Sequence, residues 1–351
     1  MPLDLFGETW QQAAETEAKP SSAVLPALHS AQSLALARVM DSRLRMGTSS
    51  WTFPGWAGLV WDQPYAEAKL SKEGLYAYSQ HPLLRTVSLD RAFYRPMTAE
   101  QYAQLAAQVD DDFRFVVKVP SMISDALIRS TEGDSAGRGL QMNPHFLDAA
   151  LFQEACVQPV LEGLGHKLGA FVLQMSPLPA HMLSRSEISK LFRLLASVLS
   201  AQSAMNLLVP EAILALELRN REFVATPLLE ELIALLKDTG ANYCLGLHAK
   251  MPSIEDQLPI LRKLWPSPLV CRWNLHPKHG RYGYEAAKSD YEPFDKLIDE
   301  DLATREQLAR VIAGTLRGGQ KAFVTINNKA EGSAPLSVGK LAQAVLEQIS
   351  R

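Results

Sequence analysis

The sequence is short of cysteines and of long apolar runs, and both shortages exclude classes of protein. Its 351 residues include three cysteines, Cys156, Cys244 and Cys271, with no CxxC spacing. An odd and widely spaced set argues against a disulfide framework and is typical of buried, reduced thiols in a cytosolic protein. No stretch approaches 18 consecutive apolar residues, so we expect no membrane span. Residues 1–20 lack the basic and apolar regions of a signal peptide, and we therefore expect a cytoplasmic protein.

The chain also lacks a large excess of charge of either sign. Its formal net charge is −3, and 21% of its residues are charged. A balance of this kind gives no general electrostatic attraction to duplex nucleic acid or to an anionic membrane. With 47% hydrophobic residues, the composition is that of an ordinary globular protein with a sizeable core.

Nucleotide-binding signatures are missing as well: neither GxGxxG nor GxxxxGK[ST] follows the first expected strand. What the chain has instead is an alternation of short apolar runs and longer amphipathic stretches. The expected strands are 45–49, 85–89, 113–119, 170–175, 213–218, 242–247, 269–273 and 321–326. The expected helices between and after them are 66–81, 98–109, 145–164, 184–200, 226–240, 253–265, 304–319 and 337–350. Eight strand–helix repeats predict an α/β fold, a (β/α)8 TIM-type barrel over residues 45–351.

Residues 1–44 differ in composition from the rest of the chain, and we expect an N-terminal arm with one helix after Pro26. Two segments that follow strands are unusually long, 120–144 and 274–303. Loops of this length are often functional lids or disordered segments. The glycine-rich stretch 132–139 matches no phosphate-binding loop.

Polar residues gather where the expected strands end. In a TIM-type barrel the loops after the strands form the active face, so these residues should meet in one pocket. Guanidinium groups suit the capture of phosphate or carboxylate, and aromatic faces suit stacking on a sugar or base. The candidate catalytic residues are Glu217, Lys118 and Asp90. The candidate ligand-binding residues are Trp51, Tyr94, Arg91, Gln174, Arg219, Arg272, Asn327 and Asn328.

Glu217 and Arg219 carry opposite charges and should point to the same side, because residues i and i+2 of a strand share a face. A partly desolvated Glu217 is the best candidate for a general base. The alternative is a structural salt bridge that closes the end of the barrel. Lys118, in the same way, is either a ligand-binding residue or a side chain that snorkels from the barrel wall.

A metal site has weak support. His276 and His279 lie three residues apart in a long loop, and a zinc site would need a third ligand such as His248. We therefore assign no metal ligands, and the sequence leaves open whether a cofactor binds.

Six ordered segments carry a family resemblance: GTSSWTFPGW, LDRAFYRP, DDFRFVVKVPSMIS, VLQMSPLP, ELRNREF and INNKAEGSAP. Over residues 45–348 the chain resembles the family called domain of unknown function 72, also known as YecE-like. The resemblance implies a TIM-type barrel and no particular reaction. The matching positions are Gly47, Trp51, Phe93, Tyr94, Pro96, Phe113, Phe115, Lys118, Gln174, Glu217, Arg219, Asn327, Asn328, Ala334 and Pro335.

The chain departs from the family pattern at two places. Ser88 stands where the family usually has an acidic residue, with Asp90 in the place of an Asn. The segment Ser124–Asp125 stands where the family usually has Ser-His. The resemblance therefore implies a pocket built like that of the family, with different chemical groups at these two places.

The sequence supports three functional hypotheses. In the first, the pocket binds a small anionic ligand, and the protein is a hydrolase or isomerase that uses Glu217 as acid or base. In the second, which the acidic net charge disfavours, it binds or processes single-stranded or damaged nucleic acid. In the third, it is a non-catalytic interaction protein whose arm contacts another chain. The sequence does not indicate an oligomeric state.

Overall fold

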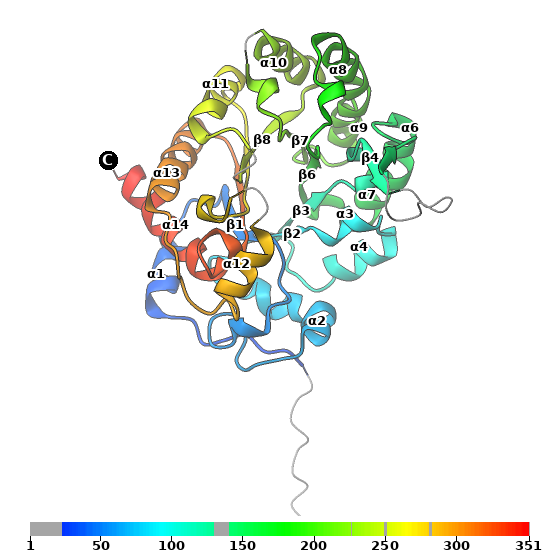
Figure 1. Cartoon of the computed structure of the whole chain (residues 1–351). Coiled ribbons are helices and arrows are strands. Elements are labelled where there is room, and N and C mark those ends of the chain that lie inside the picture. Colours follow the sequence, from blue (N-terminus) through cyan, green and yellow to red (C-terminus); the bar gives the residue numbers. More distant parts are fainter. Residues whose placement is uncertain (1–22, 130–139, 226, 249–250, 281–282, 351) are drawn as a thin grey trace, which may run out of the picture.

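Eight parallel strands close into a barrel in the computed structural model, which describes residues 23–129, 140–225, 227–248, 251–280 and 283–350 (Figure 1). The order around the barrel is β1-β10-β9-β8-β7-β6-β3-β2. The strands are β1 (Leu44–Thr48), β2 (Thr86–Leu89), β3 (Arg114–Lys118), β6 (Leu168–Gln174), β7 (Ile213–Glu217), β8 (Asn242–Leu247), β9 (Leu269–Trp273) and β10 (Ala322–Ile326). The predicted TIM-type barrel is confirmed, and every predicted strand overlaps an observed one.

Side chains alternate along each strand between the barrel interior and the surrounding helices. A small interior cluster contains Val116, Ala170, Val172, Ile213, Ala215, Cys244, Val270 and Phe323. One layer further along, the same face of four strands carries polar side chains: Lys118, Gln174, Glu217 and Arg272. The parallel register pairs Gln174 with Glu217, and it pairs Lys118 with Val172 of the interior cluster. An apolar floor therefore lies beneath a polar upper layer.

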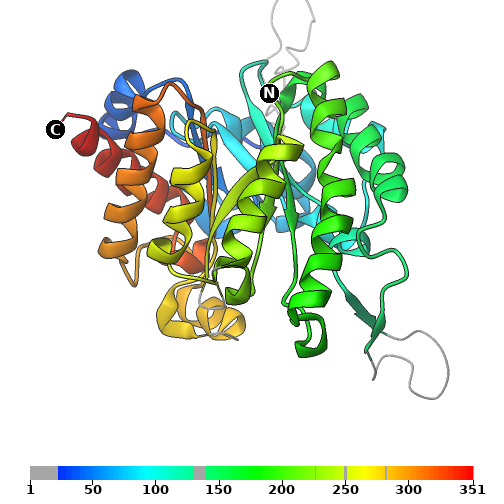
Figure 2. The same ribbon diagram turned by 90° about the horizontal axis from the view of Figure 1, so that it is seen from above.

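Helices surround the barrel in the side view (Figure 2). The larger ones are α2 (Glu67–Ser79), α4 (Ala99–Ala106), α7 (Gln158–Leu164), α8 (Arg185–Leu199), α10 (Leu228–Thr239), α11 (Ile254–Leu264), α13 (Leu302–Arg317) and α14 (Ala334–Ile349). Each overlaps a helix expected from the sequence. Local chemistry defines two of the helix ends: Thr98 forms a capping box with Gln101, and Gly240 ends α10 with a φ of 70°.

Several elements were not expected. A hairpin of β4 (Leu127–Arg129) and β5 (Leu140–Met142) lies within 120–144, and α12 (Tyr284–Tyr291) lies within 274–303. These elements escaped prediction because three to eight residues are too short for a clear period, and the hypothesis of functional lids in the two segments stays a prediction. The others are α3 (Arg91–Tyr94), α5 (Ser121–Ser124) and α9 (Ala201–Leu208), whereas α6 (Ala149–Phe152), which a π turn (Gln153–Val157) joins to α7, lies within the helix expected over 145–164.

The N-terminal region contains α1 (Ala31–Val39), which lies beside α14. Residues 1–22, the glycine-rich stretch 132–139 and Thr226 lie outside the described residues. Two of the three tryptophans between β1 and α2, Trp56 and Trp61, are fully buried packing residues.

One stretch of the described chain, Arg185–Leu208 across α8 and α9, is long and apolar enough to cross a membrane by length and composition alone. Its most apolar window is 44% buried within the fold. In α8, buried apolar residues such as Leu191 and Leu195 alternate with exposed charges such as Arg193, which is the pattern of a helix packed on a barrel.

Candidate functional site

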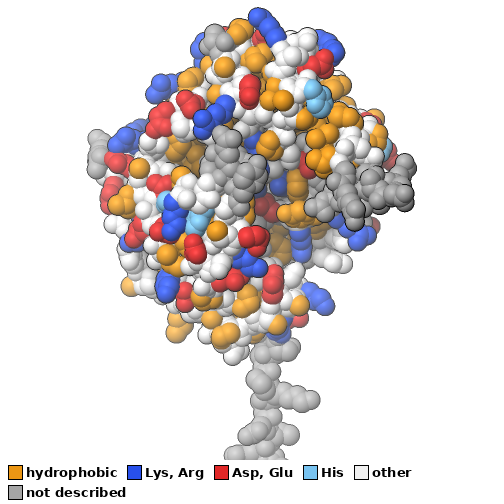
Figure 3. Space-filling model, viewed as in Figure 1, with side chains coloured by type: hydrophobic (Ala, Val, Ile, Leu, Met, Phe, Trp, Pro, Cys, Tyr) orange, Lys and Arg blue, Asp and Glu red, His pale blue; other side chains and the backbone are white. Residues whose placement is uncertain are grey.

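The carboxyl ends of the strands face the viewer in Figure 1, and α12 lies over part of this face. The space-filling view shows a hollow near the centre of the same face, where acidic and basic side chains gather (Figure 3). The polar layer at the ends of β3, β6, β7 and β9 lies at this end of the barrel. We call this region the barrel mouth.

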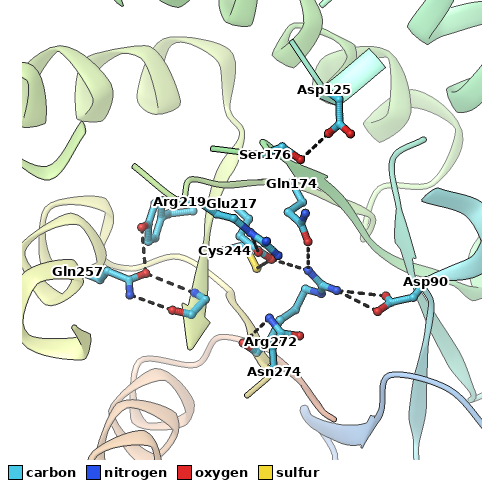
Figure 4. A network of polar contacts seen from close by, with 12 residues as sticks. Asp90, Asp125, Gln174, Ser176, Glu217, Arg219, Cys244, Gln257, Arg272 and Asn274 are labelled. Atoms are coloured by element: carbon cyan, nitrogen blue, oxygen red, sulfur yellow. Dashed lines mark hydrogen bonds and ion pairs between the residues drawn. The ribbon is translucent and has the colours of Figure 1, made fainter. Parts of the chain in front are cut away.

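Arg272 is the centre of the hydrogen-bond network at the barrel mouth (Figure 4). Its Nη1 donates to Glu217 Oε2 at 2.7 Å and to Gln174 Oε1 at 2.8 Å, and its Nη2 donates to both carboxylate oxygens of Asp90 at 3.1 and 3.2 Å. Ser88 Oγ donates to Asp90 Oδ1 at 2.6 Å. Arg272 and Glu217 are buried, and a buried ion pair survives desolvation only when its polar atoms are well satisfied.

Three charges in this network stabilise one another. Burial alone would raise the pKa of Glu217, but the charges of Arg272 and Arg219 outweigh burial and lower it. Burial likewise opposes the charge of Asp90, but Arg272 and Lys118 overcome it and lower the pKa of Asp90. Burial opposes the charge of Arg272, yet Glu217 and Asp90 raise its pKa. Glu217 is therefore a stable anion, which makes it a weak base and a poor proton donor near neutral pH.

Arg219 is bound far less completely than Arg272. Its Nε lies 3.7 Å from Glu217 Oε1, which is an ion pair but not a hydrogen bond. Both atoms are buried, and neither has a hydrogen-bond partner in the part of the chain that the structure describes. Arg219 therefore has hydrogen-bonding capacity that the described residues leave unused.

Lys118 extends from the end of β3 into the same region and is 8% exposed. Its Nζ lies 3.4 Å from the ring centroid of Phe93. Burial and the nearby charge of Arg272 lower the pKa of Lys118 to about 7, although Asp90 and Glu217 oppose the shift. Within the described residues no hydrogen bond engages this amine. Both its protonated and its neutral form are therefore populated near neutral pH.

Asp125 is a site residue that sequence patterns did not single out. Ser176 Oγ donates to Asp125 Oδ1 at 2.6 Å (Figure 4). Burial raises the pKa of Asp125, while Ser176, Lys118 and Arg219 oppose the shift. Its position was visible only as a departure from the family pattern. Asp125 adds a carboxyl group that takes up a proton more readily than Glu217 does.

The aromatic candidates differ in position. Tyr284, the first residue of α12, stacks on His248 with ring centroids 5.3 Å apart, and the Lys329 ammonium lies 5.1 Å from its ring centroid. Burial raises the pKa of Tyr284, with Arg219 and Arg272 acting in the opposite direction, so its hydroxyl lies within electrostatic range of the barrel mouth. We count Tyr284 among the residues that border the barrel mouth.

Trp51, Arg91 and Tyr94 lie apart from the network. Trp51 is buried, its Nε1 donates to Leu70 O at 3.0 Å, and the Arg91 guanidinium lies 4.9 Å from its ring centroid. Tyr94 is 83% exposed.

A groove of about 590 Å³ lies beside α2 and α4, and Lys72, Arg91 and Arg95 are among the residues that line it. We call this feature the α2–α4 groove.

The two asparagines after β10 bind groups of the protein itself. Asn327 Oδ1 accepts a hydrogen bond from Lys329 N, and buried Asn328 accepts from Trp56 Nε1 and Ala334 N. Their predicted role in ligand binding stays a prediction. The structure thus brings Asp90, Gln174, Glu217 and Arg272 into one hydrogen-bond network, with Arg219 and Lys118 held to it by charge. No hydrogen bond of the described residues joins Trp51, Tyr94, Arg91, Asn327 or Asn328 to that network.

His276 and His279, which were considered as metal ligands, make other contacts. His276 Nδ1 accepts from Lys278 N, and His279 Nε2 lies 2.8 Å from Tyr291 Oη. Among the described residues, no three His, Cys, Asp or Glu side chains are grouped closely enough to hold a metal ion.

Comparisons with known proteins agree with the fold. A family model described as "Protein of unknown function DUF72" matches residues 45–351. A DUF72 family protein of Enterococcus faecalis has a similar structure, with a TM-score of 0.53 and 18% identity over 86% of this chain and 95% of that one. One of Thermotoga maritima has a TM-score of 0.51 and 18% identity over 87% of this chain and 99% of that one. No curated protein sequence matches significantly.

Proposed function

The chain belongs to the DUF72 family of proteins of unknown function, and we propose that its barrel mouth binds a small molecule that carries a carboxylate or phosphate group. In this proposal Arg219 and Lys118 hold the anionic group. The protein is then an enzyme of the hydrolase or isomerase type, in which Lys118 and Asp125 move protons.

One observation carries the proposal: the cations of the barrel mouth differ in how many hydrogen bonds they make to the protein. Arg272 is fully engaged by Glu217, Gln174 and Asp90. Arg219 Nε has no hydrogen-bond partner among the described residues, and the Lys118 ammonium lies against an aromatic face. Buried donors without partners cost free energy, and an oxyanion in the barrel mouth would supply the missing acceptors.

The proposal moves the acid–base role away from Glu217. The sequence favoured Glu217 as general base, but a carboxylate with a lowered pKa that accepts a 2.7 Å bond from Arg272 is better suited to orienting the arginine. Lys118, with a pKa of about 7, suits proton transfer near neutral pH. Asp125, whose pKa burial raises, is the second proton carrier.

Sulfate is the probe of choice, because its charge stays constant across the neutral pH range. A ligand at 100 times its dissociation constant stabilises a protein by about 2.7 kcal/mol. We expect sulfate to raise the Tm of the wild type, and Arg219→Gln and Lys118→Met to abolish most of that rise. Arg221→Gln and Lys288→Met, which remove exposed charges nearby, are the matched controls and should respond like the wild type.

The pH dependence has a definite sign. The Lys118 ammonium is present below its pKa of about 7 and is lost above it. Sulfate stabilisation should therefore weaken between about pH 6 and about pH 8 in the wild type, and this dependence should be absent in Lys118→Met. Equal sulfate responses in the wild type and both site variants would contradict the proposal.

A second candidate function rests on the α2–α4 groove. Lys72, Arg91 and Arg95 line it, and the exposed ring of Tyr94 lies on the adjoining helix α3. Basic side chains beside an exposed aromatic ring are a common arrangement for single-stranded nucleic acid. Binding of a short oligonucleotide that falls steeply with added salt, and that Arg95→Gln weakens, would support it. No binding at low salt would exclude it.

We also propose a cytoplasmic location. Cys156, Cys244 and Cys271 are free and buried, as reduced thiols of a cytosolic protein usually are.

A further inference from the structure

We propose that Lys118 acts as a nucleophilic amine and forms a Schiff base with a carbonyl compound that also carries an anionic group, such as a 2-oxo acid. This inference rests on the proposed function for the anionic group, which Arg219 would hold. It adds the reacting group of the ligand, a ketone or aldehyde carbon.

The surroundings of Lys118 are those that a nucleophilic amine needs. A lysine attacks a carbonyl only as the neutral amine, so it must lose its proton near working pH. Lys118 is 8% exposed and has two arginines within electrostatic range, and these outweigh the attraction of the ammonium to the Phe93 ring, whose centroid lies 3.4 Å from Nζ. Burial and neighbouring cations both disfavour the ammonium. The lowered pKa of Lys118, about 7, agrees with this geometry.

The amine also has no hydrogen bond within the described chain. Lysines that serve a structural role usually donate to a carboxylate, as Lys278 does to Asp299 and Lys263 to Glu230. The carboxylates whose charges act on Lys118, Asp90 and Glu217, are instead bound by Arg272. Arg272 therefore keeps these carboxylates from capturing the amine as a fixed ion pair.

The reaction balances with the side chains of the barrel mouth and the carbonyl compound alone. The nitrogen lone pair attacks the carbonyl carbon and forms the C–N bond, the carbonyl π bond breaks, and the oxygen takes a proton from the Asp125 carboxyl to become a hydroxyl. The nitrogen then gives one of its two protons to the Asp125 carboxylate. The hydroxyl takes that proton from Asp125 and leaves as water, the nitrogen lone pair forms the C=N bond, and the product is a protonated imine with Asp125 as a carboxylate. Asp125 is the proton donor for this departure, because it is a carboxyl with a raised pKa that accepts a hydrogen bond from Ser176.

Reductive trapping tests the proposal directly. The full-length protein is incubated at about pH 8 with pyruvate and sodium cyanoborohydride, whose hydride converts an imine into a stable secondary amine. Intact mass and peptide mapping then locate the adduct. We expect one adduct, on Lys118, formed at least about ten times faster than on exposed lysines such as Lys288. Lys118→Arg, which keeps a long side chain but has no primary amine, should not form it, and Lys329→Met should form it normally.

The pH profile supplies a second readout. Trapping at Lys118 should rise from about pH 6 and level off above about pH 8, because the amine is neutral above its pKa of about 7. Trapping at exposed lysines should keep rising toward about pH 10. Adducts spread evenly over exposed lysines, or an unchanged adduct in Lys118→Arg, would overturn the proposal.

Two further arms separate this inference from the proposed function. Methyl pyruvate keeps the ketone but lacks the anion, and the sulfate experiment reports the anion site without a carbonyl. Trapping of both compounds at Lys118 at equal rates, with no sulfate response, supports the Schiff base and contradicts the anion site. A sulfate response that depends on Arg219 without any trapping at Lys118 supports the anion site and overturns the Schiff base.

Discussion

At the scale of single residues, the two arginines of the barrel mouth differ in how much of their hydrogen-bonding capacity the protein uses. Arg272 donates to three side chains and is neutralised by two carboxylates, whereas Arg219 has an ion pair at 3.7 Å. The two residues belong to the same chemical type, and both follow apolar residues in the sequence. Only the spatial arrangement separates the arginine that builds the site from the arginine that remains available to a ligand.

Lys118 should make stability depend on pH. In the unfolded chain its pKa is near 10.5, and in the folded protein it is about 7. Between these values the unfolded chain binds the extra proton, so the free energy of unfolding of the wild type should rise with pH, by a few kcal/mol at about 1.4 kcal/mol per pKa unit. Lys118→Met should therefore be more stable than the wild type at about pH 6, and the difference should shrink toward about pH 10 in urea denaturation. A difference that stays constant with pH would show that burial does not shift this lysine.

Substitution of Glu217 tests the buried ion pair that it forms with Arg272. Glu217→Gln removes the negative charge that Arg272 contacts at 2.7 Å, and leaves a buried guanidinium with Asp90 as its remaining carboxylate. Breaking a buried pair from one side costs about 3–5 kcal/mol, and we expect about 3 kcal/mol here because Asp90 remains. Exposed Glu222→Gln is the control and should change stability by less than about 0.5 kcal/mol. Equal effects of the two substitutions would contradict the assigned role.

At the scale of elements, the ends of the helices follow local chemistry that the sequence makes readable. Gly240 ends α10 with a φ of 70°, where a Cβ meets no close neighbour, while Gly339 lies inside α14 with ordinary helical backbone and open space around it. Gly240→Ala should therefore destabilise the protein by about 1 kcal/mol through backbone strain alone. Gly339→Ala should stabilise it by about 0.5–1 kcal/mol. Thermal denaturation measures both, and changes of the same sign would contradict the assignment.

Other elements were beyond reach of the sequence for physical reasons. The strands and main helices were predictable because each contains enough residues for its apolar repeat to be recognised in the sequence. The helix α12 was not, since its eight residues span about two turns and only Ala287 and Tyr291 among them are buried, which is too little for a clear apolar period. The roles of Asn328 and Trp51 were hidden for a related reason: a polar group that binds backbone and one that binds a ligand look alike in a sequence.

At the scale of the whole molecule, the closed parallel barrel explains why residues far apart in the chain meet. Lys118, Glu217 and Arg272 lie at the ends of three different strands, and parallel closure brings all three to one face. The convergence of strand-end residues was therefore predictable from eight strand–helix repeats. Which of them bind one another, and which stay available, depends on side-chain geometry that no spacing rule contains.

The N-terminal region provides a test at this scale. The side chains of the barrel mouth network all lie after residue 44, so deletion of residues 1–22 should leave both the Tm and the sulfate response unchanged. The hypothesis of an interaction arm predicts in addition that the deletion lowers the mass measured by light scattering or releases a bound partner. Loss of the sulfate response on deletion would show that the arm completes the barrel mouth.

The most direct test of the anion site is a crystal structure of the protein soaked in sulfate. We predict a sulfate ion in the barrel mouth, with its oxygens within hydrogen-bond distance of Arg219 and of Lys118 Nζ, while Arg272 keeps its bonds to Glu217 and Asp90. A barrel mouth that stays free of sulfate at saturating concentration, or sulfate bound only in the α2–α4 groove, would contradict it.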